Sequence, residues 1–150
     1  MHPFRITFIV CFAACCTASG LAQSPIRGDG ASDERAAVRA VLDQYVRVTD
    51  FRDSAAIAKS FHPTAVLSSV TTGGALKAMT QDEWWERVAK IPTDTPPRRS
   101  TIALIEVVGI AAVARVDITD ARGNSSSDLF TLQKTKEGWR IVNKVLSKPV

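Results

Sequence analysis

The stretch SSSDLFTLQKTKEGWRIVNKVL, residues 125–146, holds two runs of alternating polar and apolar residues around a short polar link. Alternation with a period of two is typical of strands, because successive side chains point to opposite faces of a sheet. The link Thr135-Lys136-Glu137-Gly138 is too short for a crossover and favours a hairpin. The sequence therefore predicts two antiparallel strands, at residues 125–134 and 139–146.

Further strand-like runs lie upstream of this hairpin. Residues 99–108 and 111–119 flank the link Gly109-Ile110, which favours a second hairpin. Residues 65–70 and 75–79 are shorter strand candidates around a turn that contains two glycines. We therefore expect four long strands at the C-terminal end and two short strands before them.

Three helices are predicted by apolar residues at helical spacing. The first starts at Ser32, the second is short and follows Asp53, and the third starts at Thr80, which can form a capping box with Glu83. Helices that lie mostly ahead of an antiparallel sheet indicate the α+β class rather than alternating α/β. We expect the order α-α-β-β-α-β-β-β-β in one domain, residues 32–148, after a flexible linker at residues 23–31.

The first 22 residues are typical of a bacterial signal peptide. Arg5 supplies positive charge, the run from Ile6 to Cys16 is apolar except for Thr7, and Gly20-Leu21-Ala22 fits a small-x-small cleavage pattern. We expect a periplasmic or secreted protein without a membrane span after cleavage, which would also remove every cysteine. Two alternatives are a retained membrane anchor and lipoprotein processing at Cys15.

Composition excludes several classes of protein. The chain has 150 residues, a formal charge of +4 and 45% hydrophobic residues, which excludes a disordered chain. Three cysteines and two histidines exclude a zinc finger, a disulfide framework and a multi-histidine metal site. The basic residues are scattered and no phosphate-binding glycine motif occurs. We therefore expect no nucleic-acid partner, no cofactor and no metal.

Four stretches carry a resemblance to a known family: the first helix ending in Asp50, Phe61-His62-Pro63-Thr64-Ala65, Asp128-Leu129-Phe130-Thr131-Leu132 and Gly138-Trp139-Arg140-Ile141-Val142-Asn143-Lys144. Together with the order of elements, they resemble the nuclear transport factor 2-like superfamily, and within it the lumazine-binding group close to the SnoaL-like branch. The resemblance implies a cystatin-like cone, in which three helices pack in the mouth of a strongly curved, mainly antiparallel sheet around a cavity. This fold hosts isomerases, dehydratases, binding proteins and assembly modules, so the resemblance does not choose an activity.

The register of the last hairpin places polar residues on the predicted cavity face. A pairing of Lys134 with Trp139 aligns three further pairs on that face: Leu132 with Ile141, Phe130 with Asn143, and Asp128 with Val145. A buried carboxylate or amide is costly unless it is hydrogen-bonded. Asp128 and Asn143 are therefore either polar groups of a mostly apolar pocket or a structural hydrogen bond between the strands.

The second hairpin divides its residues between two faces. With Val108 opposite Ala111, one face is small and smooth and suits packing. The other face carries Glu106, Arg115 and Asp117, which could line a cavity or a dimer interface, or could be a solvated ion-pair face.

Single aromatic and imidazole side chains complete the set of candidates. His62 is the only imidazole after residue 2, so it is either a general base or ligand contact, or a turn residue that bonds the backbone. Tyr45 faces inward with a hydroxyl that needs a partner. Trp84 is directed inward by its pairing with Met79, so Trp85 should lie at the cavity rim or against a partner subunit.

Three hypotheses follow. The first is an exported, cofactor-free protein that binds a small molecule, flat and aromatic or pterin-like by the resemblance, and that forms a homodimer through the outer face of the sheet. Its ligand contacts would be Tyr45, His62, Trp85, Asp128, Phe130 and Asn143. The second is an isomerase or dehydratase of the SnoaL or ketosteroid-isomerase type with His62, Asp128 or Asp117 as proton shuttle. The third is a dimeric interaction module whose cavity is filled by its own side chains.

Overall fold

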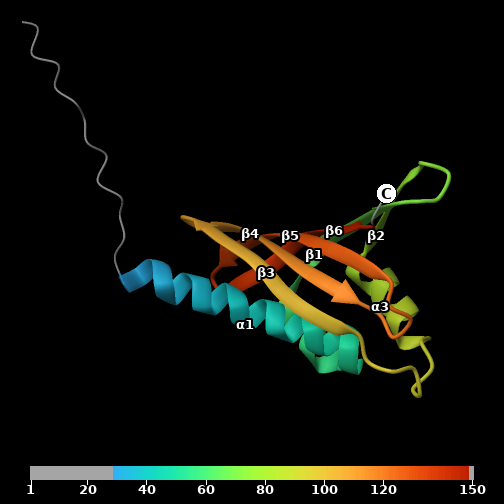
Figure 1. Ribbon diagram of the computed structural model, residues 1–150. Helices are drawn as coiled ribbons and strands as arrows, with labels where there is room; N and C mark the ends of the chain where they lie inside the picture. Colours follow the sequence, from blue (N-terminus) through green and yellow to red (C-terminus); the bar gives the residue numbers. More distant parts are fainter. Residues whose placement is uncertain (1–28, 149–150) are drawn as a thin grey trace, which may run out of the picture.

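The computed structural model describes residues 29–148. The chain order confirms the predicted α+β class, with three helices and a six-stranded sheet (Figure 1). The helical elements are α1 (Asp29–Phe51), the 3₁₀ turn η1 (Ser54–Ala56), α2 (Ile57–Ser60) and α3 (Gln81–Ala89). The strands are β1 (Phe61–Val70), β2 (Leu76–Thr80), β3 (Arg99–Val108), β4 (Ala111–Thr119), β5 (Ser125–Thr135) and β6 (Gly138–Ser147).

The strands form one open sheet in the order β2-β1-β6-β5-β4-β3. All neighbouring strands are antiparallel except β1 and β6, which are parallel. Figure 1 shows α1 lying along one face of the sheet, with the β1–β2 hairpin extending away from the rest. We call the helix-covered side the inner face and the opposite side the outer face.

The core lies between α1 and the inner face. Residues of β4 alternate between buried and accessible positions, and the small side chains Ala112 and Ala114 are among the buried ones. From α1, Leu42 and Tyr45 are fully buried against this face. Because fully burying a Leu side chain contributes about 1.5–3 kcal/mol, this stripe of apolar contacts holds α1 on the sheet. The prediction that the small face of the second hairpin packs is confirmed for β4 and for Ile105 of β3. It is wrong for Thr101 and Ala103 of β3, which are exposed.

Local capping explains where α3 begins. The Glu83 amide donates to Thr80 Oγ1 at 3.2 Å, and the Thr80 amide donates to Glu83 Oε2 at 2.8 Å, which completes the predicted capping box. The hydrogen bonds that the Thr80 amide and hydroxyl donate to the Glu83 carboxylate lower the pKa of Glu83. The fixed start of α3 directs Trp84 toward the core, as predicted.

Two elements begin three or more residues before their predicted starts. Helix α1 begins at Asp29, so residues 29–31 of the expected linker are helical. Strand β1 begins at Phe61, four residues before the predicted start at residue 65. The early start of β1 follows from the pairing of Phe61 with Ile141 of β6, and Pro63 is compatible with it because it biases the residue before it toward extended backbone.

A register shift in the last hairpin overturns part of the predicted cavity face. Strands β5 and β6 pair as predicted at Lys134 with Trp139 and at Leu132 with Ile141. The register then shifts, and the next pairs are Thr131 with Asn143, Phe130 with Lys144 and Asp128 with Leu146. The predicted pairs of Phe130 with Asn143 and of Asp128 with Val145 are therefore wrong. Val142 is the extra residue of a β-bulge, which moves every later side chain of β6 to the opposite face.

A second shift changes the second hairpin in the same way. Val108 pairs with Ala111 as predicted, but the register shifts between Ile102 and Leu104. Ile102 pairs with Val116 and Ser100 with Ile118, so both join the inner face instead of the outer face on which the unbroken alternation placed them. The extra residue Ala103 thereby brings the Ser100 hydroxyl to the end of α1.

Candidate functional site

A pocket of about 420 Å³ lies beside the C-terminal end of α1 and beside α3. The segment before β3, the β4–β5 turn and residues of β5 and β6 complete its lining. We call it the mouth pocket. Its apolar wall is formed by Trp84, Val88, Ile91, Pro96, Pro97 and Leu146. Its charged groups are Asp50, Arg52, Arg98, Asp120, Arg122, Asp128 and Lys144. The pocket is thus mostly apolar in its wall, with charges at defined places.

A buried ion pair lies on the floor of the mouth pocket. Lys144 Nζ is 3.2 Å from Asp128 Oδ2, and both side chains are almost completely buried. The Tyr45 hydroxyl donates a hydrogen bond to the same oxygen. The other oxygen, Asp128 Oδ1, is buried and has no hydrogen-bond partner within residues 29–148. A buried carboxylate oxygen without a donor costs about 1–3 kcal/mol, and a hydrogen bond from a ligand or a water would offset that cost.

Aromatic rings surround the Lys144 ammonium. Its Nζ lies 5.1 Å from the ring centroid of Trp84 and 5.4 Å from that of Tyr45, within the range of cation–π attraction. Burial lowers the pKa of Lys144, while the negative charge of Asp128 opposes that shift. Burial and the same negative charge raise the pKa of Tyr45 well above 10.0, which keeps its hydroxyl protonated as a donor. The floor therefore holds a fixed donor and a fixed acceptor side by side.

A second buried carboxylate, Asp50, accepts hydrogen bonds from the protein at both of its oxygens. Arg98 Nε and Nη2 both donate to Asp50 Oδ1 at 3.1 Å. Thr49 Oγ1 donates to the same oxygen at 2.9 Å, and Ser100 Oγ donates to Oδ2 at 2.8 Å. This network ties the end of α1 to the start of β3. Asp50 is therefore a structural group that shapes the pocket, in contrast to Asp128.

Two arginines lie at the rim of the mouth pocket. Arg52 adopts a left-handed backbone conformation with φ of 56°, which costs a non-glycine residue about 1–2 kcal/mol. Its Nη1 and Nη2 donate to the Thr93 and Thr95 carbonyls at 3.4 and 3.1 Å, whereas its buried Nε has no partner in the described part of the chain. Arg122 lies in the exposed β4–β5 turn, and no hydrogen bond or ion pair engages its guanidinium within the described residues.

Three of the predicted ligand contacts gather at the floor, although in different roles. Asp128 lines the mouth pocket. Tyr45 lies behind it and contacts Phe130, with ring centroids 4.8 Å apart. Phe130 is buried in the core, and its ring packs in a T-shaped arrangement against that of Tyr45. Among the tryptophans, Trp84 lines the pocket and Trp85 does not.

The remaining candidates lie elsewhere. Asn143 pairs with Thr131 on the outer face because of the bulge at Val142. His62 lines a separate hollow of about 360 Å³ beside Arg140, and its Nδ1 lies 2.8 Å from Thr64 Oγ1. His62 and Asp128 therefore do not form the dyad that an acid–base mechanism could use.

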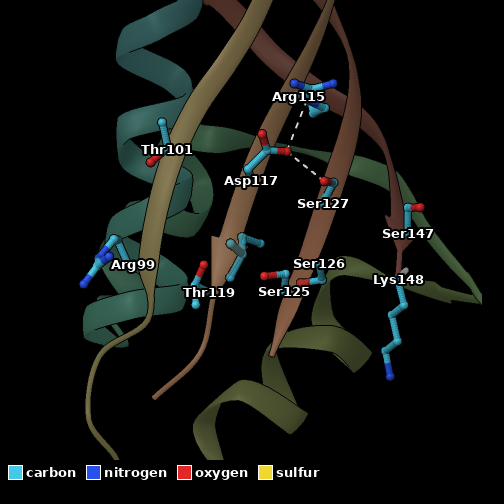
Figure 2. A pocket seen from close by; sticks show the side chains of 11 residues that line it. Arg99, Thr101, Arg115, Asp117, Thr119, Ser125, Ser126, Ser127, Ser147 and Lys148 are labelled. Carbon is cyan, nitrogen blue, oxygen red and sulfur yellow. Dashed lines mark hydrogen bonds and ion pairs between the residues drawn. The ribbon is translucent and has the colours of Figure 1, made fainter. Parts of the chain in front are cut away.

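Asp117, the third proton-shuttle candidate, belongs to a hollow of about 550 Å³ on the outer face (Figure 2). Figure 2 shows Asp117 directed toward Arg115 and Ser127, with Arg99 and Lys148 pointing away on opposite sides. Arg115 Nε lies 3.2 Å from Asp117 Oδ1, and Ser127 Oγ donates to the same atom at 2.7 Å. This hollow is larger than the mouth pocket, but its carboxylate is half-exposed and already partnered. The mouth pocket is therefore the better candidate site.

Lys144, Arg52 and the pairing of Asp50 with Arg98 were not predicted from the sequence. Lys144 could be found only with the bulge, and Ile141-Val142-Asn143 contains neither glycine nor proline to indicate one. Arg52 had a weak signal, because it follows the residue at which the helical pattern breaks.

Comparison with known proteins identifies the family. The family model described as "Putative lumazine-binding" matches residues 33–147. The chain belongs to this family. Two solved NTF2-like proteins of unknown function are similar to it: one from Shewanella baltica OS155 with 26% identity and a TM-score of 0.72, and one from Methylobacillus flagellatus KT with 27% identity and a TM-score of 0.66. The match covers 79% of this chain in both cases, and 96% and 94% of those chains.

Other comparisons support the fold alone. A domain with a cystatin-like fold from Nostoc punctiforme PCC 73102 shares 16% identity with a TM-score of 0.63, over 79% of each chain. No significant match was found among curated proteins. The predicted NTF2-like, lumazine-binding resemblance is thereby confirmed, and with it a fold of the small-molecule-binding kind.

Residues 29–148 also carry information about two other kinds of site. Between residues 29 and 148, none of the helices has the length and apolar character that a membrane span needs. In the same range, no group of three or more His, Cys, Asp or Glu side chains is placed to hold a metal ion.

Proposed function

We propose that the protein binds a small, planar heteroaromatic molecule in the mouth pocket. The observation that supports this most directly is the buried, unpartnered Asp128 Oδ1 beside the Lys144 ammonium on the floor of an apolar-walled pocket. Ligand sites are typically apolar cavities with a few convergent polar groups, and the volume of about 420 Å³ falls in their usual range.

The floor groups indicate which ligand edge fits. Asp128 Oδ1 accepts a hydrogen bond from an N–H, and Lys144 Nζ donates one to a carbonyl oxygen. A ring with an N–H beside a C=O, as in a pterin or a lumazine, satisfies both at once, which agrees with the ligand class that the family resemblance implies. Trp84 offers a flat ring in the wall, against which such a ligand can stack.

The experiment is a titration of the purified protein with lumazine and with pterin, in which binding is measured by ligand fluorescence and by the shift in Tm of the protein. Asp128→Asn replaces the acceptor by an amide of the same shape, and we expect it to weaken binding at least about tenfold. The matched control is Asp117→Asn, which alters the outer face and should leave the affinity unchanged. Equal binding by both variants, with Asp128→Asn still folded, would place the ligand elsewhere.

Two further parts of the proposal concern the state of the protein. We propose that it is exported through its N-terminal segment, which lies outside the described residues. N-terminal sequencing of the protein recovered from its native envelope checks this, and a start at Gln23 is the expected result.

We also propose a homodimer formed through the outer face. Exposed apolar side chains lie on this face at Leu104, Val113, Leu129 and Val145, and Leu129 pairs directly with Val145. Sedimentation over a range of concentrations should show a dimer, and Leu129→Lys should shift it to the monomer by placing a charge in the apolar strip. A monomer at every concentration would contradict this part of the proposal.

A further inference from the structure

The charged groups of the mouth pocket do not balance. Asp50 is paired with Arg98, and Asp128 with Lys144. The carboxylate of Asp120 closes its own turn, since it accepts hydrogen bonds from the Arg122 and Asn124 amides and from the Asn124 side chain. Within the described residues, no carboxylate forms an ion pair with Arg52 or Arg122, although the charge of Arg122 contributes to the lowered pKa of Asp120. Because two guanidinium groups stand against the single carboxylate of Asp120, the rim carries a net positive charge above a neutral floor.

The conformation of Arg52 adds an independent observation. Its φ of 56° is one that glycine and asparagine adopt far more readily than arginine. Two of its terminal nitrogens are already held by the Thr93 and Thr95 carbonyls, which fixes the guanidinium over the pocket-lining segment before β3. The buried Nε keeps an unused donor. Strained, fixed side chains with an unpaired group are more frequent at ligand sites than elsewhere.

We infer that the ligand is an anion: a planar heteroaromatic ring whose N–H and C=O edge meets Asp128 and Lys144, and whose other end carries an acid group bound by Arg52 and Arg122. This inference rests on the proposed function and adds the charge of the ligand to it. The fully buried floor receives the ring edge, and the acid group remains at the rim, where the arginines lie and where water still reaches it. A carboxylate or a phosphate supplies the same chemistry there, because both accept hydrogen bonds from guanidinium groups.

The test compares two probes that share one ring system, pterin and pterin-6-carboxylate, by fluorescence titration at low ionic strength. We expect the carboxylate to bind about tenfold tighter or better, since charge-assisted hydrogen bonds are about twice as strong as neutral ones. Arg122→Gln in the exposed turn, and Arg52→Gln combined with it, should bring the two affinities to within about twofold of each other. Raising the salt concentration should reduce the difference in the wild type, because the rim is open to solvent. A phosphate-bearing analogue in place of pterin-6-carboxylate shows which of the two acid groups is preferred.

The control variant is Arg99→Gln, which removes an equal charge from the outer-face hollow and should leave the preference unchanged. Circular dichroism and the Tm of each variant establish that it is folded. Equal affinity of the wild type for both probes would overturn the inference and leave the proposed function standing. If neither probe binds, the result would overturn the proposed function for this ring system, and the inference with it. A preference that survives in the folded double variant would also overturn the assignment to the two arginines.

Discussion

Replacing Lys144 by methionine tests the buried ion pair most directly. Methionine keeps the unbranched apolar stem that packs against Trp84 and removes the ammonium. Asp128, with none of its surface exposed, would retain only the Tyr45 hydroxyl as a partner. Removing one member of a buried ion pair costs about 3–5 kcal/mol, because the remaining charge stays buried without compensation. For a chain of this length, we expect Tm to fall by roughly 10–20 °C.

The assay is urea unfolding followed by tryptophan fluorescence and circular dichroism. The matched control is Lys134→Met on the neighbouring strand β5, because Lys134 forms an ion pair with Glu34 that is partly open to solvent. Its effect should be close to the error of the measurement. The double variant Lys144→Met with Asp128→Asn should recover about 2 kcal/mol relative to Lys144→Met alone, since the amide carries no charge. Equal destabilisation by Lys144→Met and Lys134→Met, or strict additivity in the double variant, would refute the claim that Lys144 compensates the buried charge of Asp128.

Three further changes test other parts of the structure. Arg98→Met should destabilise the protein by about 2–4 kcal/mol in urea unfolding, because it leaves the buried Asp50 with only two hydroxyl donors; an effect below about 0.5 kcal/mol would contradict the role given to this pair. Asn143→Asp should change the free energy of unfolding by less than about 0.5 kcal/mol if Asn143 lies on the outer face, whereas an inner position beside Asp128 would add a second buried carboxylate and cost several kcal/mol. The raised pKa of Tyr45 predicts a loss of stability above pH 10, because the unfolded chain releases the phenol proton first. Tyr45→Phe should lose this component of the pH dependence, and parallel stability curves for the two proteins above pH 10 would argue against it.

Much of the architecture could be predicted because its signals are local. Alternation in β4, the capping box at Thr80 and Glu83, and the short links at Gly109 and Gly138 depend on neighbours within a few residues. These features predicted every strand from β3 to β6 to within one residue at each end. The early start of β1 was missed because pairing with β6, a distant segment, decides it.

The candidate site was predictable only in part, because contacts between distant segments decide which side chains reach it. Asp128 and Tyr45 could be placed inside because each lies on an apolar face of its own element. Asn143 was predicted on the inner face, but Lys144 lies there instead, because one extra residue in a strand reverses the face of all the residues that follow it. Asp50 and Arg52 lie at or just after the end of α1, and they meet Arg98 in the pocket although Arg98 follows Asp50 by 48 residues.

The sequence by itself determined the class of the fold, the order of its elements and the presence of a carboxylate among apolar residues, since hydrophobic periodicity and turn chemistry act over short distances. Only the tertiary structure decided which charges meet at the pocket. That choice depends on two β-bulges, at Val142 and Ala103, which carry no signal of their own. A bulge forms where the curvature of a whole sheet requires it, so its position is a property of the packed strands together.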